Sequence, residues 1–156
     1  MQTRAQVTTT TTVTGTTSNG MLSLNTGYLR TVNAWLKIVQ ILIGFIVLLM
    51  LVSTSSGWTS YAGNFLEMTA FCFLVITFLM LLSCIASLSG MTLLTTLFYI
   101  NYHILAFIFY LAGSVAVFVE LGSSNDGVAI TAGVFGLFNS ALYGINALFA
   151  LKGRLN

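Results

Sequence analysis

Residues 34–52 read AWLKIVQILIGFIVLLMLV, an apolar run interrupted only by Lys37 and Gln40. At 1.5 Å per residue, a helix of this length spans about 28 Å, close to the hydrocarbon thickness of a bilayer. Three similar runs follow, at residues 65–88, 91–119 and 127–151. The short connections between these runs favour antiparallel neighbours. The sequence therefore predicts an all-α membrane protein, an antiparallel four-helix transmembrane bundle.

The composition excludes several other classes of protein. Charged residues make up 5% of the 156 residues, whereas soluble proteins carry about 25%, and the chain has no Lys/Arg cluster of the kind that binds nucleic acid. Cys72 and Cys84 are about 18 Å apart along one helix, too far to form a disulfide. His103 is the only histidine and has no nearby cysteine with which to share a metal. We therefore expect no metal site, no cofactor and no nucleic-acid partner.

The distribution of charge predicts an orientation. We expect residues 1–30 to form a disordered, Thr-rich tail, residues 31–152 a four-span domain and residues 153–156 a short second tail. An even number of spans places both termini on one side of the membrane, and all five basic residues fall on that side. The positive-inside rule makes that side cytoplasmic. The three acids fall on the opposite side: Glu67, Glu120 and Asp126.

Residues near the two membrane surfaces are expected to anchor the bundle. Lys37 lies about one turn inside the first span, so its ammonium is predicted to reach the headgroups along an apolar stem. Trp35 and Trp58 are typical of aromatic anchors at the membrane interfaces. Trp58 belongs to the first outer loop.

Polar side chains inside the spans are candidates for contacts between helices. We expect intramembrane hydrogen bonds from Gln40, His103, Asn139, Tyr143 and Asn146. His103 is also the candidate for a path for ions or protons. Such paths usually use relays of Asp, Glu and His, and the two glutamates lie at the outer boundary, so helix–helix contact is the favoured interpretation.

The fourth span carries small residues at intervals of four: Ala132, Gly136, Ser140 and Gly144. Such a ridge lets helices approach closely in a membrane. It could pack inside the bundle, which we favour, or form a contact in a homo-oligomer. Near the cytoplasmic end of the second span, Cys84 is either a palmitoylation site or a small buried side chain, the favoured alternative.

Several stretches of the chain resemble the MARVEL-domain family, the four-span proteins that include plasmolipin, MAL and the chemokine-like-factor MARVEL proteins. They are residues 29–44 (LRTVNAWLKIVQILIG), 102–116 (YHILAFIFYLAGSVA), 132–136 (AGVFG) and 142–144 (LYG). The Thr-rich tail leading into NTGYL at residues 25–29 is similar to that of insect members. The resemblance covers almost the whole membrane part of the chain.

The resemblance implies a non-enzymatic organiser acting in vesicle traffic, lipid-domain organisation or membrane apposition. Its implied partners are membrane lipids, including sterol-rich ones, and other integral membrane proteins, and its implied place is the plasma membrane or secretory–endosomal vesicles. The family offers no catalytic residues to carry over. Two alternatives stay open: a small channel, transporter or pore subunit with a polar path through His103, and a junctional adhesion protein using the outer loops.

Overall fold

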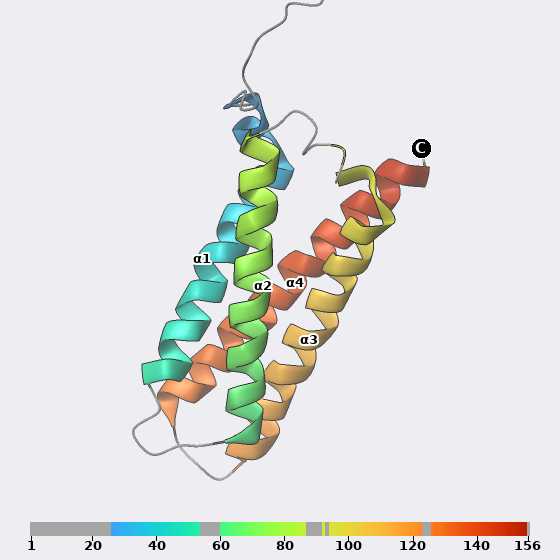
Figure 1. Ribbon diagram of the computed structural model, residues 1–156. Helices are drawn as coiled ribbons and strands as arrows, with labels where there is room; N and C mark the ends of the chain where they lie inside the picture. Colours follow the sequence, from blue (N-terminus) through green and yellow to red (C-terminus); the bar gives the residue numbers. More distant parts are fainter. Residues whose placement is uncertain (1–25, 54–59, 87–91, 93, 123–125, 156) are drawn as a thin grey trace, which may run out of the picture.

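The computed structural model describes residues 26–53, 60–86, 92, 94–122 and 126–155. A 3-10 helix, η1 (Thr26–Arg30), precedes four α-helices: α1 (Val32–Ser53), α2 (Tyr61–Ala86), α3 (Leu97–Leu121) and α4 (Gly127–Leu155). Each α-helix is long and apolar enough to cross a membrane. The helices run alternately up and down, so α1 begins and α4 ends at the same end of the bundle, here called the terminal end (Figure 1). The predicted all-α four-span bundle is confirmed.

Each helix packs against the next, and α4 also packs against α1. The α1–α2 pair and the α3–α4 pair lean away from each other toward the terminal end (Figure 1). The bundle is therefore more open at the terminal end than at the opposite end.

The polar residues and the smallest residues face inward, with helical spacing. On α1 the buried residues are Ala34, Lys37, Gln40, Gly44, Val47 and Leu51. Large apolar side chains point outward instead, and Met68, Phe138 and Leu148 are each more than 60% exposed. Such a surface suits a lipid environment, because hydrocarbon chains solvate apolar side chains and cannot hydrogen-bond to polar ones.

Several boundaries of the elements differ from the prediction, and the second helix begins at Tyr61 rather than residue 65. The predicted tail extended to residue 30, but Tyr28 of η1 is 1% exposed and packs with Ala34 and Cys84. The third helix begins at Leu97 rather than residue 91, because the Thr96 hydroxyl caps it by accepting a hydrogen bond from the Tyr99 amide at 3.3 Å. The fourth helix continues to Leu155 through the predicted second tail. Residues 1–25 of the predicted tail lie outside the described residues.

Candidate functional site

Lys37 is turned into the bundle and is fully buried. Its Nζ donates a hydrogen bond to the Tyr99 hydroxyl at 2.5 Å and lies 4.5 Å from the centroid of that ring. A cation over an aromatic face is stabilised by the ring quadrupole. The expectation that Lys37 reaches the headgroups is therefore wrong, because Tyr99 provides it with a partner inside the bundle. Trp35 is 60% exposed on the outer surface, while Trp58 lies outside the described residues.

His103 is buried in an aromatic cage. Its ring centroid lies 4.1 Å from that of Tyr99, 5.2 Å from Tyr102 and 5.8 Å from Tyr143. The Nδ1 atom lies 2.8 Å from the Tyr99 carbonyl oxygen, and because a carbonyl only accepts, Nδ1 carries the proton. Nε2 has no hydrogen-bond partner among the described residues.

Gln40 and Asn146 join α1 to α4. The Asn146 amide nitrogen donates to the Gln40 Oε1 at 3.3 Å. The complementary atoms of the same two side chains, Gln40 Nε2 and Asn146 Oδ1, make no hydrogen bond within the described structure. The pair is therefore held by one of the two hydrogen bonds that facing amides can form.

Tyr143 takes part in a hydroxyl cluster that also includes a residue not singled out from the sequence, Thr77. The Thr77 Oγ1 lies 2.7 Å from the Tyr143 hydroxyl and 2.8 Å from the Tyr102 hydroxyl. Tyr102 also donates to the Phe73 carbonyl at 3.0 Å. The cluster ties together α2, α3 and α4.

Asn139 lies in the centre of the bundle, where a glycine makes room for polar groups. A Cβ atom on Gly44 would lie 3.1 Å from the Tyr110 hydroxyl and 3.5 Å from the Asn139 Nδ2. The Tyr110 hydroxyl and both amide atoms of Asn139 lack a hydrogen-bond partner among the described residues. Helices α3 and α4 thus bring polar atoms to one point, where α1 has a glycine and no side chain.

The small-residue ridge of α4 packs against α3 of the same chain. A Cβ on Gly136 would lie 2.3 Å from the Ser114 Oγ, and one on Gly144 would lie 3.2 Å from the Phe107 ring. The Ser140 hydroxyl donates to the Phe107 carbonyl at 2.9 Å, and Ala132 is fully buried. Most of the ridge is thus occupied within the bundle, and Gly144 also lines a groove on the outer surface.

At the end opposite the termini, Glu120 of α3 secures the start of α2. Its Oε2 accepts hydrogen bonds from the Ser60 hydroxyl and from the Ala62 amide, the latter at 3.0 Å. The amides of a first helical turn need acceptors from outside the helix, and this carboxylate supplies one. Glu67 is partly exposed and lies in the second turn of α2, near the same end of the bundle.

Cys84 is 1% exposed, beneath Tyr28 of η1 in the same packed cluster. An acyl chain could reach this thiol only if η1 moved away, so its burial favours a small packed side chain over a palmitoylation site. Burial also raises the pKa of the Tyr28 hydroxyl, which keeps it protonated against the apolar cluster.

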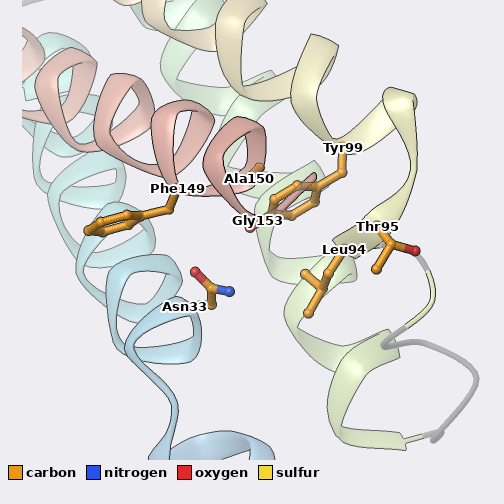
Figure 2. A pocket seen from close by; sticks show the side chains of 7 residues that line it. All are labelled: Asn33, Leu94, Thr95, Tyr99, Phe149, Ala150 and Gly153. Carbon is orange, nitrogen blue, oxygen red and sulfur yellow. The ribbon is translucent and has the colours of Figure 1, made fainter. Parts of the chain in front are cut away.

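The terminal end holds a cavity of about 360 Å³ between three helices. Figure 2 shows its walls, with Asn33 from α1, Tyr99 from the first turn of α3 and Phe149 from α4. The remaining lining residues are Leu94, Thr95, Ala150 and Gly153. The divergence of the two helix pairs toward this end leaves the space open.

The described residues contain no group of three or more His, Cys, Asp or Glu side chains that could hold a metal ion. The polar interior instead consists of tyrosines, amides, hydroxyls, one histidine and one lysine. These groups can form hydrogen bonds between helices and can bind small polar molecules such as water.

Comparison with known proteins identifies one family. The family model of the MARVEL membrane-associating domain matches residues 28–149, a range that begins in η1 and ends in the last turns of α4. No curated protein and no solved structure shows significant similarity to the chain. Because the family match covers most of the chain, the family resemblance seen in the sequence is confirmed. The chain is a multi-pass integral membrane protein that belongs to the MARVEL family of membrane-associating domains.

Proposed function

We propose that the protein is a non-enzymatic organiser of membranes, which gathers lipids and other membrane proteins around a compact bundle. Its setting would be vesicle traffic, lipid-domain organisation or membrane apposition, at the plasma membrane or on secretory–endosomal vesicles. The observation that carries this proposal is the division of the chain into a polar interior and an apolar exterior. The described helices expose large apolar side chains on the outer surface along their whole length.

Grooves on the outer surface support a role in lateral contact with lipid. One groove of about 440 Å³ lies between α3 and α4, where it is lined by Ile104, Phe107, Gly144 and Leu148 among other apolar residues. Its volume is in the range of small-molecule sites, and its chemistry suits an acyl chain or a sterol. Contacts of this kind would let the bundle select its lipid neighbours by shape.

We also propose that the terminal end faces the cytoplasm. Arg30 and Lys37 lie near the start of α1, and Lys152 lies in the last turns of α4. A clustering of basic residues next to the spans is typical of the cytoplasmic side. Protease treatment of sealed vesicles that carry an epitope tag at either terminus tests the proposal: protection of both tags in right-side-out vesicles is expected, and cleavage of either tag would contradict it.

The organiser role is tested by depleting the protein from cells that make it. We expect a change in the delivery of membrane proteins to the surface and in lipid order, measured with an environment-sensitive dye. Wild-type protein should restore both, whereas Phe138→Ala, which removes a lipid-facing ring without touching the interior, should restore them less well. Phe138→Leu is the matched control that keeps an apolar side chain. Unchanged delivery and unchanged lipid order after depletion would contradict the proposal.

A second candidate function is a proton path through His103. The observation that favours it is the set of buried polar atoms without protein partners, which includes His103 Nε2, the Tyr110 hydroxyl and the Asn139 amide. Such atoms often bind internal water. Proton flux into vesicles that contain the purified protein, abolished by His103→Ala, would support this candidate; no flux from a folded preparation would remove it.

A further inference from the structure

Three polar side chains from three helices lie in one layer of the bundle. Lys37 of α1 contacts Tyr99 of α3 near the terminal end. Gln40 follows Lys37 by three residues and His103 follows Tyr99 by four, so both lie about one helical turn further into the bundle. Asn146 of α4 belongs to the same layer, because its amide nitrogen donates to Gln40 at 3.3 Å. All three side chains of the layer are at most 1% exposed.

The His103 ring also faces the part of α4 that carries Asn146. Its centroid lies 5.8 Å from that of Tyr143, which precedes Asn146 by three residues. Residues three apart lie on the same side of a helix, and both of these are buried. Side chains of α1, α3 and α4 thus converge on one region of the interior.

Each side chain of this layer has one polar atom that makes no hydrogen bond within the described structure: His103 Nε2, Gln40 Nε2 and Asn146 Oδ1. Polar atoms that are buried without a partner cost free energy, and hydrocarbon outside the bundle cannot supply one. The layer therefore favours a small polar partner that can bond to all three atoms.

The hydrogen-bonding character of the three atoms points to water. Gln40 Nε2 donates and Asn146 Oδ1 accepts, while His103 Nε2 accepts because Nδ1 carries the ring proton. We propose that a water molecule binds in this layer, where it accepts from Gln40 and donates to His103 and Asn146. Three hydrogen bonds are typical of a buried water. A metal cation or an ammonium could not accept from Gln40, and an anion could not donate to the two acceptors.

The cavity at the terminal end gives water a short route to this layer. Tyr99 and Ala150 both line the cavity (Figure 2). Tyr99 lies four residues from His103 on α3, and Ala150 lies four residues from Asn146 on α4, so each is about one turn away from the proposed site. The proposal concerns the binding of water alone, so it holds whether or not the protein organises lipids or conducts protons.

His103 is the only histidine of the chain, which makes the site directly observable. The full-length protein, labelled with nitrogen-15 in histidine alone, is reconstituted in phosphatidylcholine bilayers, and solid-state NMR measures magnetisation transfer from water protons to the ring nitrogens. We expect Nε2 to receive magnetisation earlier than Nδ1, whose proton bonds to the Tyr99 carbonyl. We also expect the Nε2 chemical shift to be that of an unprotonated, hydrogen-bonded nitrogen.

A double variant and a matched control assign the water to this layer. Gln40→Leu combined with Asn146→Leu leaves His103 as the single partner and should abolish the early transfer, because a buried water needs at least two polar partners. Asn139→Leu makes the same change at another buried amide of α4 whose polar atoms lack partners among the described residues. It lies about two turns from Asn146 and should leave the early transfer unchanged. Helical circular dichroism shows that each variant is folded.

The result from the folded wild-type protein decides the proposal even if a variant does not fold. Transfer to Nε2 no earlier than to Nδ1 would overturn the proposal, because a water bonded to Nε2 must transfer first. A protonated Nε2 would also overturn it, since that atom could then only donate. Retention of the early transfer in the double variant, or an equal loss in Asn139→Leu, would contradict the assignment of the water to Gln40, His103 and Asn146.

Discussion

Gly136→Ala should destabilise the bundle by placing a methyl group against Ser114. The added Cβ would lie 2.3 Å from the Ser114 Oγ, well inside van der Waals contact, while the next neighbours, Leu66 Cδ1 and Ser114 Cβ, lie at 3.4 and 3.5 Å. The clash is therefore with one atom. Overpacking of this size costs about 1–2 kcal/mol of the free energy of unfolding.

Because the clash involves only the Ser114 Oγ, Ser114→Ala should relieve it. The Ser114 hydroxyl has no hydrogen-bond partner among the described residues, so Ser114→Ala alone should change stability by less than about 0.5 kcal/mol. In the double variant the Gly136→Ala penalty should disappear, giving a coupling free energy of about 1–2 kcal/mol.

The assay is equilibrium unfolding of the four proteins in mixed micelles of mild detergent and dodecyl sulfate, followed by helical circular dichroism. Gly127→Ala is the control, since a Cβ at that position meets nothing within 4 Å. Additive effects of the two substitutions, or no loss of stability in Gly136→Ala, would refute the assigned packing of α4 against α3.

Four further substitutions probe three polar contacts by the same unfolding assay. Glu120→Ala should cost about 1–2 kcal/mol, because it removes the acceptor for the start of α2; Glu67→Ala is the control, and an equal loss in both variants would contradict the assignment. Lys37→Met should leave stability unchanged or raise it, since it removes a buried charge and keeps the volume, and a loss of several kcal/mol would show that the charge itself stabilises the fold. Gln40→Leu and Asn146→Leu should each cost about 1 kcal/mol and together little more, because either one breaks the same hydrogen bond; fully additive losses would mean that the two amides do not interact.

The number, length and type of the helices could be predicted because membrane insertion imposes a strong length and polarity requirement on each span. Boundaries were less predictable where local hydroxyl groups compete with helix formation. The Thr95 hydroxyl bonds to the Thr92 carbonyl and Thr96 caps the helix, so α3 begins later than hydropathy alone indicated. Tyr28 could not be placed from the sequence, because its burial depends on α2, far along the chain.

The sequence could predict which face of a helix carries the polar residues of the candidate site. It could not predict which residues of other helices they contact. The spacing of three and four residues between Lys37, Gln40 and Gly44 puts them on one helical face, and all three are buried together. The hydrogen-bond partner of Lys37 lies 62 residues away on α3, and no local pattern identifies such a pair. Thr77 was missed because a lone threonine in an apolar helix gives no periodic signal, although its hydroxyl contacts two tyrosines.

The composition of the protein's native surroundings is the most direct test of whether this bundle gathers selected neighbours around its apolar surface. Membranes from cells that make the tagged protein are cut into discs with an amphipathic copolymer, and the lipids and proteins captured with the bundle are quantified by mass spectrometry against the bulk membrane. We expect discs enriched several-fold in particular lipids and membrane proteins, with the enrichment reduced in Phe138→Ala. Discs of the same composition as the bulk membrane would contradict it.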